Sequence, residues 1–265
     1  MLIAQLSDPH VCAENTLYQG LVDSNAMLVA AVRHVNELLP VPDVVILSGD
    51  VTENGADEEY AHCRKILSAI EQPLIVIPGN HDKREAFRSC FSDMDYLPQT
   101  GPLHFVISEL GPVRIVGIDV IVSGAHHGEI NDQVIDWLDD CLAAEPDRPT
   151  MIILHQPPFK SGIPFIDEYR CFGGERLEKL LANYTMVERV VCGHVHRFIQ
   201  RRFAGTLICT APSTTTSIAL RLSAGADPAS YLEPPALLLH SWHPTDGMVT
   251  HLVPVGSFPG PYEFF

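Results

Sequence analysis

Basic residues are scarce in this sequence. Only 17 lysines and arginines stand against 33 aspartates and glutamates, which gives a formal net charge of −16. Such an excess of negative charge repels the phosphate backbone, so we expect neither extended nucleic acid nor an anionic membrane as a partner. A small anionic substrate is still compatible with it, because bound cations can reverse the field locally.

Long apolar runs and paired cysteine motifs are also missing. No apolar stretch reaches membrane-spanning length, and Asp8 and His10 interrupt the short run that a secretory signal would need. The seven cysteines are odd in number and include no CxxC pair, which is typical of reduced thiols rather than of a disulfide framework. We therefore expect a cytoplasmic protein.

The pattern of apolar residues favours an α/β fold. Hydrophobic residues make up 46% of the 265 positions, enough to bury a sizeable core. Apolar or β-branched runs predict strands at 2–6, 43–47, 74–77, 114–118, 151–154, 189–192, 206–209 and 236–240. Helical spacing connects several of them, through 28–39, 60–70, 134–142 and 174–184. The first third thus reads βαβαβ, which predicts a parallel central sheet with helices packed on it.

We expect a single domain over 1–265, because no repeat, low-complexity tract or linker divides the chain. The last quarter loses helical periodicity, and 223–235 is rich in Gly, Pro, Ala and Ser, which predicts a loop. We expect the strand- and loop-rich segment 205–265 to cap the site or to form an oligomer contact.

Side chains of metal-ligand type follow five of the predicted strands. Because the carboxyl ends of strands in α/β sheets open on a common crevice, we expect these side chains to converge. Each motif alone has an ordinary explanation, such as a turn, a cap or a hydrogen-bonded core histidine. Their joint occurrence at strand exits predicts a metal centre. The seven candidate ligands are Asp8, His10, Asp50, Asn80, His155, His194 and His196.

The order of these motifs resembles the calcineurin-like metallophosphoesterase superfamily, and none of its motifs is missing. The motifs are Asp8-x-His10, Gly49-Asp50, Gly79-Asn80-His81-Asp82, His155 and Gly193-His194-x-His196. Flanking residues, such as His155-Gln156-Pro157-Pro158, are similar to those of the class III cyclic nucleotide phosphodiesterase and glycerophosphodiesterase branch. The resemblance implies a four-layer αββα sandwich and a homodimer or larger homo-oligomer.

The resemblance also implies two divalent metal ions per chain, drawn from manganese, iron, zinc and cobalt. One ion would be held by Asp8, His10 and His196, the other by Asn80, His155 and His194, with Asp50 bridging both. His81 would lie beside the phosphate rather than on a metal, which makes it the expected catalytic residue. We expect the substrate to contact His81, Asn80 and His196.

Elementary chemistry explains why a phosphodiesterase would use this set. Mixed imidazole, carboxylate and amide ligands suit transition metals better than Mg²⁺ or Ca²⁺. With only two carboxylates, Asp8 and Asp50, two divalent ions leave the site a charge of about +2, which attracts an anionic substrate. We expect a metal-bound hydroxide to attack phosphorus in line, with His81 assisting the phosphate oxygens or the leaving alkoxide. The substrates would be cyclic nucleotides or glycerophosphodiesters.

Other functions of the same superfamily fit the motifs equally well. Leaving-group selection lies in peripheral loops, so a phosphomonoesterase or a nucleotide or lipid-sugar pyrophosphatase is an open alternative. A non-catalytic interaction scaffold is disfavoured, because all seven ligand positions are present. Near the site we expect Asp82 to cap the next helix rather than to orient His81, and we expect His126-His127 to face solvent rather than to bind a metal. Thr214–Thr216 are predicted either to line the substrate pocket or to pack as β-branched residues.

Overall fold

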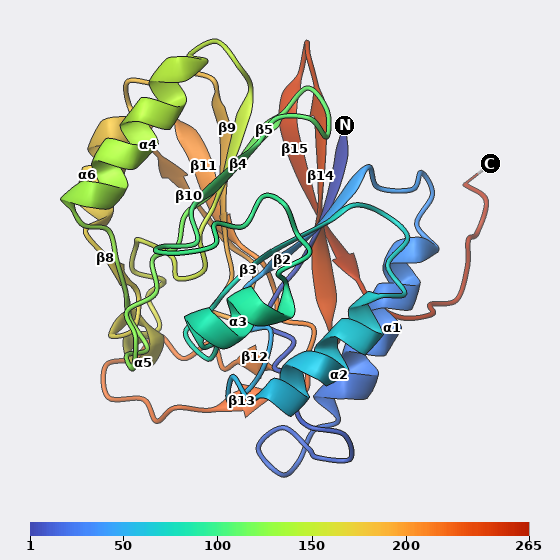
Figure 1. The fold of residues 1–265 in the computed structure, drawn as a ribbon. Coiled ribbons are helices and arrows are strands. Elements are labelled where there is room, and N and C mark those ends of the chain that lie inside the picture. Colours follow the sequence, from blue (N-terminus) through green and yellow to red (C-terminus); the bar gives the residue numbers. More distant parts are fainter. Residues whose placement is uncertain (265) are drawn as a thin grey trace.

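Two β-sheets lie against each other in this computed structural model, which describes residues 1–264 (Figure 1). The last residue of the expected domain and of the segment 205–265 lies outside the described residues. The first sheet has the order β15-β14-β1-β2-β3. Its strands are β1 (Leu2–Leu6), β2 (Val44–Ser48), β3 (Leu74–Ile77), β14 (Ala236–His243) and β15 (Gly247–Pro254).

The second sheet has the order β10-β11-β9-β7-β5-β4. Its strands are β4 (Phe105–Ile107), β5 (Arg114–Gly117), β7 (Thr150–Ile153), β9 (Val187–Cys192), β10 (Ile199–Phe203) and β11 (Thr206–Thr210). Two short ribbons accompany the sheets. They pair β6 (Gly128–Glu129) with β8 (Cys171–Phe172), and β12 (Ser217–Ile218) with β13 (Ser230–Tyr231).

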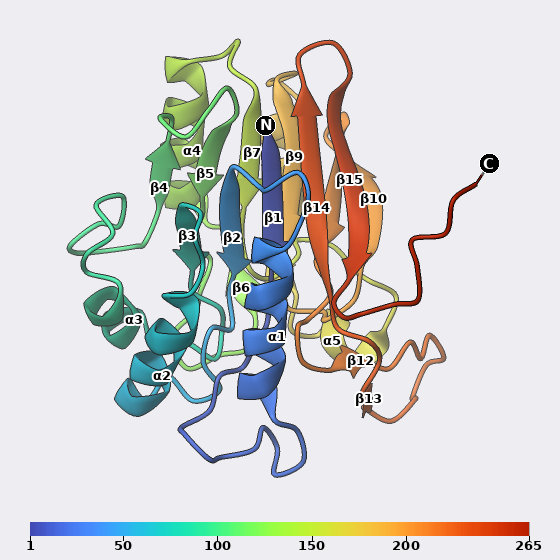
Figure 2. The ribbon, with the colours of Figure 1, turned by 90° about the vertical axis from the view of Figure 1, so that its right-hand side faces the viewer.

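Helices cover the outer face of each sheet (Figures 1 and 2). The first sheet carries α1 (Ser24–Asn36) and α2 (Asp57–Leu67), and α3 (Arg84–Cys90) packs beside α2. The second sheet carries α4 (Asp132–Ala144) and α6 (Gly174–Leu181). A single-turn helix, α5 (Pro164–Asp167), lies near the strand ends. The order helix–sheet–sheet–helix confirms the predicted four-layer αββα sandwich.

Four helices, α1, α2, α4 and α6, form where the sequence predicts them, because their apolar residues share one face. The short helices α3 and α5 were not predicted. In α1 this face buries Leu28, Ala31, Val32 and Val35 against the first sheet. Two side-chain caps fix helix starts: Asp23 accepts a hydrogen bond from the Ala26 amide, and Asn131 caps α4 in the same way. None of the helices within 1–264 has the length and apolar content needed to cross a membrane.

Parallel pairing brings the ligand-bearing strand ends to one side of the molecule. Strands β1, β2 and β3 run parallel in the first sheet, and β5, β7, β9 and β11 do so in the second. Segment 205–264 contributes to both sheets, through β11 in one and β14–β15 in the other. The prediction of a loop at 223–235 was wrong in one detail, because Ser230–Tyr231 form the strand β13. Two residues are too few to show the alternation of a strand in the sequence.

Candidate metal centre and active site

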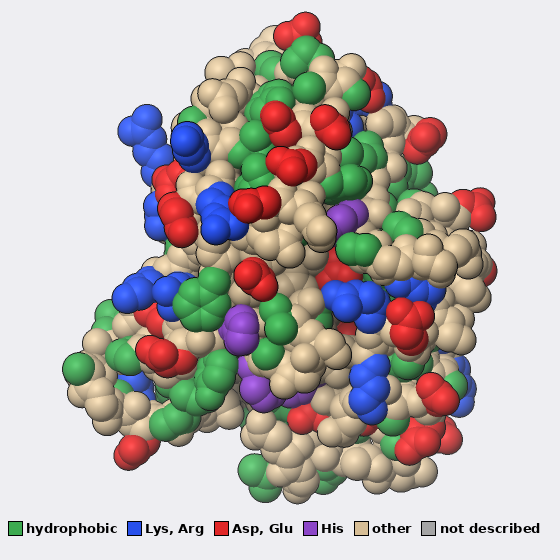
Figure 3. Space-filling view, turned by 60° about the vertical axis from the view of Figure 1, so that its left-hand side comes forward, with side chains coloured by type: hydrophobic (Ala, Val, Ile, Leu, Met, Phe, Trp, Pro, Cys, Tyr) green, Lys and Arg blue, Asp and Glu red, His purple; other side chains and the backbone are tan. Residues whose placement is uncertain are grey.

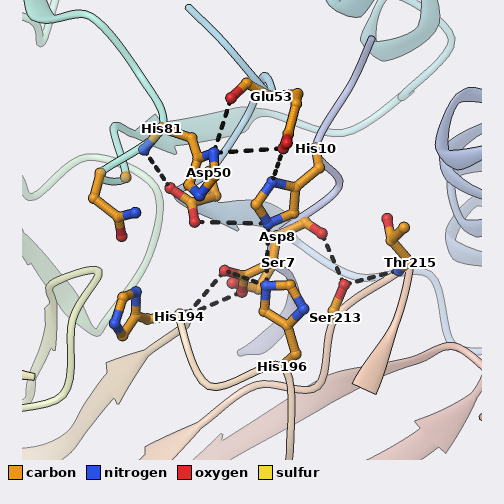
Figure 4. A network of polar contacts seen from close by, with 12 residues as sticks. Ser7, Asp8, His10, Asp50, Glu53, His81, His194, His196, Ser213 and Thr215 are labelled. Carbon is orange, nitrogen blue, oxygen red and sulfur yellow. Dashed lines mark hydrogen bonds and ion pairs between the residues drawn. The ribbon is translucent and has the colours of Figure 1, made fainter. Parts of the chain in front are cut away.

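The seven candidate ligands follow strands of both sheets. Asp8 and His10 follow β1, Asp50 follows β2 and Asn80 follows β3, whereas His155 follows β7 and His194 and His196 follow β9. Figure 4 shows several of these side chains converging. Their donor atoms form two groups within 4.8 Å, one of Asp8, His10, Asp50 and His196 and the other of Asp50, His155 and His194. Asp50 belongs to both groups, and Asn80 lines the same cavity.

Five of these residues adopt a left-handed backbone that non-glycine residues rarely use. The φ angles are 52° at Asp8, 45° at His10, 46° at Asp50, 70° at His194 and 54° at His196. Each such residue costs on the order of 1–3 kcal/mol, and residues of this kind cluster at functional sites. The conformation turns the chain sharply at each strand exit, so the side chains point into a common space.

Two glycines, Gly49 and Gly79, leave the room that neighbouring candidate ligands need. A Cβ on Gly79 would lie 2.1 Å from Asp50 Oδ1, and one on Gly49 would lie 2.2 Å from His155 Nδ1. These approaches are far shorter than ordinary contacts, so only glycine fits. The Gly-Asp and Gly-Asn motifs therefore place backbone directly against a ligand side chain.

His10 and His196 face each other through nitrogen atoms that carry lone pairs. The Nδ1 atom of His196 donates to the Thr216 carbonyl at 2.9 Å, and Nδ1 of His10 donates to Glu53 Oε2 at 2.8 Å. In the neutral rings both Nε2 atoms are then acceptors, yet they are only 3.0 Å apart. A cation coordinated by both nitrogens resolves this contact.

The second group shows the same arrangement around His155. Its Nδ1 donates to the Ser48 carbonyl at 2.8 Å, so Nε2, 3.3 Å from Asp50 Oδ1, is the nitrogen that can hold either a proton or a metal cation against this carboxylate. Among residues 1–264, three buried polar atoms beside the cavity have no hydrogen-bond partner: His155 Nε2, His194 Nε2 and Asn80 Oδ1. Buried polar atoms without a partner are costly, and coordination to a cation would satisfy all three. The residues present thus fit a dinuclear metal centre.

The electrostatics of the site also favour cations. Burial raises the pKa of Asp8 to about 6, although nearby His155 opposes this rise. Burial alone would lower the pKa of His155, but the Asp50 carboxylate outweighs it and raises this pKa to about 9. Burial, reinforced by the charge of His155, lowers the pKa of His194 to about 3, so this ring is neutral and can offer a nitrogen lone pair to a metal. Positive charge of any source is stabilised between the two carboxylates.

His81 lies beside the two groups. Its backbone amide donates to Asp50 Oδ1 at 2.9 Å, and its Nδ1 donates to the Glu53 carbonyl at 2.8 Å. The ring lines the cavity and packs edge-on against His10, with ring centroids 4.7 Å apart. Because Nδ1 is already hydrogen-bonded, Nε2 is the ring nitrogen that can contact a molecule bound in the cavity.

Asp82 does not cap the following helix, so that expectation was wrong. Helix α3 has Lys83 at its N-cap and no side-chain cap. The Asp82 carboxylate is buried and accepts hydrogen bonds from the amides of Val51, Thr52 and Gly79, and from the Tyr60 hydroxyl. It ties the Asp50 turn to the Asn80 turn, and three backbone donors converging on it explain why it turns inward.

Sequence reasoning missed two polar residues of the site. Glu53 contacts His10 and lies 3.4 Å from the Nδ1 atom of His81, but only its place three residues after Asp50 could have indicated it. His126 is exposed, as expected, whereas His127 is half-buried against Phe172. His126 also lines the cavity, with its Nδ1 3.4 Å from Asn80 Nδ2. Folding of the loop after β5 brings His126 there.

The three threonines have different positions. Thr216 lines the cavity and its carbonyl orients His196. Thr215 is buried and its hydroxyl donates to the Pro9 carbonyl at 2.9 Å, while the Thr214 amide donates to the Ser7 carbonyl. Both expected roles therefore occur, one in Thr216 and the other in its two predecessors.

The sequence of this chain is similar to that of known phosphoesterases. The family model described as calcineurin-like phosphoesterase matches residues 1–198. The probable glycerophosphodiester phosphodiesterase GpdQ of Arcobacter nitrofigilis is 35% identical over 266 residues, covering 100% of this chain and 97% of the relative. The 3',5'-cyclic adenosine monophosphate phosphodiesterase CpdA of Escherichia coli K12 is 27% identical, covering 80% and 75%.

Solved structures support the fold. A dimetal phosphatase of Danio rerio superimposes with a TM-score of 0.64 at 13% sequence identity, covering 97% of this chain and 99% of that chain. At this identity the likeness concerns the fold alone.

Proposed function

The chain belongs to the calcineurin-like phosphoesterase family, and we propose that it is a metal-dependent phosphodiesterase acting on small molecules. Cyclic nucleotides and glycerophosphodiesters are the candidate substrates, because the relatives named above carry these activities in their names. The observation that carries the proposal is the set of acceptor atoms that face one another, above all the two Nε2 atoms of His10 and His196.

We assign the ligands as the sequence predicts. Asp8, His10 and His196 would hold one divalent cation, Asn80, His155 and His194 the other, and Asp50 both. When bound, two such cations supply Lewis-acid stabilisation of the phosphate charge and lower the pKa of water. Manganese, iron, zinc and cobalt are the candidates, because imidazole donors suit these metals.

The chain's own contribution to the reaction centres on His81. Its Nδ1 is held by the Glu53 carbonyl, which directs Nε2 toward the cavity. In the imidazolium form Nε2 donates a hydrogen bond to a phosphate oxygen, and then a proton to the leaving alkoxide. Asn80 and His196, which line the same cavity, would contact the substrate as well.

Replacing His81 tests this role. We expect His81→Ala to lower kcat by roughly 10²- to 10⁴-fold, the usual contribution of a general acid, while both metals stay bound. His127→Ala is the matched control, because this histidine packs on Phe172, does not line the cavity and should not affect turnover. Loss of metal from His81→Ala would instead identify His81 as a ligand.

Metal removal and a pair of aryl phosphates test the proposed activity. Protein treated with a chelator should lose nearly all hydrolysis of bis(p-nitrophenyl) phosphate and regain it with Mn²⁺. The diester should be cleaved faster than p-nitrophenyl phosphate at saturating Mn²⁺. Full activity without metal would refute the mechanism, and a strong preference for the monoester would identify a phosphomonoesterase.

Location and assembly are part of the proposal. A cytoplasmic location is supported by the seven cysteines, all unpaired. A homodimer or larger homo-oligomer is supported by exposed aromatic side chains in the C-terminal segment, where Phe258 is 60% and Tyr262 79% exposed. The net charge of −16 supports neither nucleic acid nor an anionic membrane as a partner.

A further inference from the structure

The cavity beside the metal centre, of about 400 Å³, has an apolar wall. One half of the wall comes from the α5 region, with Phe165, Ile166 and Tyr169. The other half comes from the segment around the β12–β13 ribbon, with Ile218, Pro228 and Ala229 among its residues. Figure 3 shows histidine side chains in a hollow of this face, with hydrophobic side chains next to them.

Aromatic rings connect the expected metal ligands to this wall. His126 contacts the Asn80 amide and lies 5.8 Å from His81 between ring centroids. Tyr169 follows at 5.5 Å from His126, and Phe165 at 5.6 Å from Tyr169, both edge-on. Phe165 remains 38% exposed, so it has surface left for a ligand.

The cavity contains no lysine or arginine among its lining residues, and Asp50 is its only acid. Binding of an anion there depends on the metal centre and on the histidines beside it, and an ester arm that lies against the apolar wall and bears a second phosphate or a carboxylate meets no lysine or arginine. An apolar arm, by contrast, finds the wall just described, where burial of flat rings is favourable.

The wall is held in place by contacts to the metal-ligand segment. Arg197 directly follows His196, and its guanidinium pairs with both carboxylate oxygens of Glu233 at 3.0 and 2.6 Å. The same guanidinium donates to the Ile218 carbonyl. The β12–β13 half of the wall is thus tied to the segment that carries His196.

We propose that this wall, with Phe165 and Tyr169 at its centre, binds an aromatic ring carried by the ester arm that stays on the phosphate when the leaving group departs. The inference rests on the proposed phosphodiesterase function and makes it more specific. Diesters with an aryl or nucleobase arm are preferred over diesters whose arms are only hydroxylated, such as those of glycerol. Phe165 and Tyr169 are then specificity-determining residues that act on binding and leave the chemical step unchanged.

Two substrates with the same leaving group separate ring binding from chemistry. Bis(p-nitrophenyl) phosphate and ethyl p-nitrophenyl phosphate both release p-nitrophenolate, but only the first retains an aryl arm. For Phe165→Ala we expect KM for the bis-aryl diester to rise roughly tenfold, the typical effect of losing one stacked ring, with kcat within about twofold. KM for the ethyl diester should stay unchanged. Cyclic AMP and glycerophosphoethanolamine form a second pair with the same expected contrast.

Control variants keep the test decisive. Phe172→Ala removes a phenylalanine of similar exposure, 39%, that does not line the cavity, so both KM values should stay at the wild-type level. Phe165→Leu keeps an apolar side chain for folding but lacks the flat ring, and should raise KM for the bis-aryl diester alone.

Equal changes for both diesters, or none in either Phe165 variant, would overturn the wall as a ring site. That failure is distinguishable from failure of the proposed function. Metal-dependent hydrolysis of diesters by the wild-type protein would then persist, whereas its absence would refute the function and the ring site together.

Discussion

His240 gives a quantitative prediction about the support beneath the metal centre. This residue of β14 is fully buried, and its Nε2 lies 3.0 Å from Gln5 Oε1, so it donates to that amide. Gln5 in turn donates to Ser48 and to the Cys192 carbonyl, which joins the two sheets just below the ligands. Burial, helped by Arg189, lowers the pKa of His240 from 6.5 to about 3.

The direction of the pH effect follows from this shift. The unfolded chain binds a proton at this histidine below pH 6.5, whereas the folded chain binds it only near pH 3. Stability contributed by neutral His240 is therefore complete above pH 6.5 and declines as the pH falls toward 3. At pH 5 the difference spans 1.5 pH units, worth about 2 kcal/mol of unfolding free energy.

Urea unfolding of wild type and His240→Gln at pH 8, 7, 6 and 5 measures this contribution. The variant is less stable at pH 8, but between pH 8 and pH 5 it should lose about 2 kcal/mol less than wild type, since glutamine does not titrate. Taking the difference cancels the other groups common to both proteins. His243→Gln, on the same strand but with a side chain 63% exposed, should follow wild type. Parallel curves for wild type and His240→Gln would show that this histidine is not held neutral by the fold.

Three further variants probe the site itself. A Cβ at Gly193 would lie 2.7 Å from the Asp8 carboxylate, so Gly193→Ala should displace this side chain. We expect bound metal to fall from two equivalents toward one and kcat to fall by roughly 10²-fold. Metal analysis that still finds two equivalents would contradict this. Arg197→Met removes the two hydrogen bonds to Glu233 and should raise KM for bis-aryl diesters several-fold with kcat unchanged. Glu233→Gln keeps one acceptor oxygen, so it should raise this KM less.

Much of the metal centre could be predicted because its information is local. Each ligand stands directly after an apolar run that forms a strand, and parallel strands end on one side. The Asn131 cap and the apolar face of α1 follow from the same kind of local pattern. Periodicity does not tell which sheet a strand joins, however. That His155 comes from the second sheet while Asp50 comes from the first is visible only in the structure.

The residues that sequence reasoning missed depend on chain segments that meet only after folding. Phe165 belongs to a one-turn helix, and Ser230 to a two-residue strand, both too short to show a period. Glu53 and Asp82 have polar side chains that suit a surface as well as an interior. Their roles depend on which backbone donors and imidazoles surround them, and these come from other turns. Tertiary context, rather than propensity, decides such positions.

The left-handed backbone and the facing acceptors have one common explanation. Five candidate ligand positions carry conformational strain, and imidazole nitrogens and carboxylate oxygens converge on one space, where only a positive charge can separate them. Both features cost folding free energy, and both are compensated by a ligand that binds the folded chain more tightly than the unfolded one. Two divalent cations meet this requirement, since each draws together donors that otherwise repel. On the proposed function, the strand exits would therefore supply the chemistry, while the α5 and β12–β13 segments, which contain none of the seven candidate ligands, would set which ester arm is accepted.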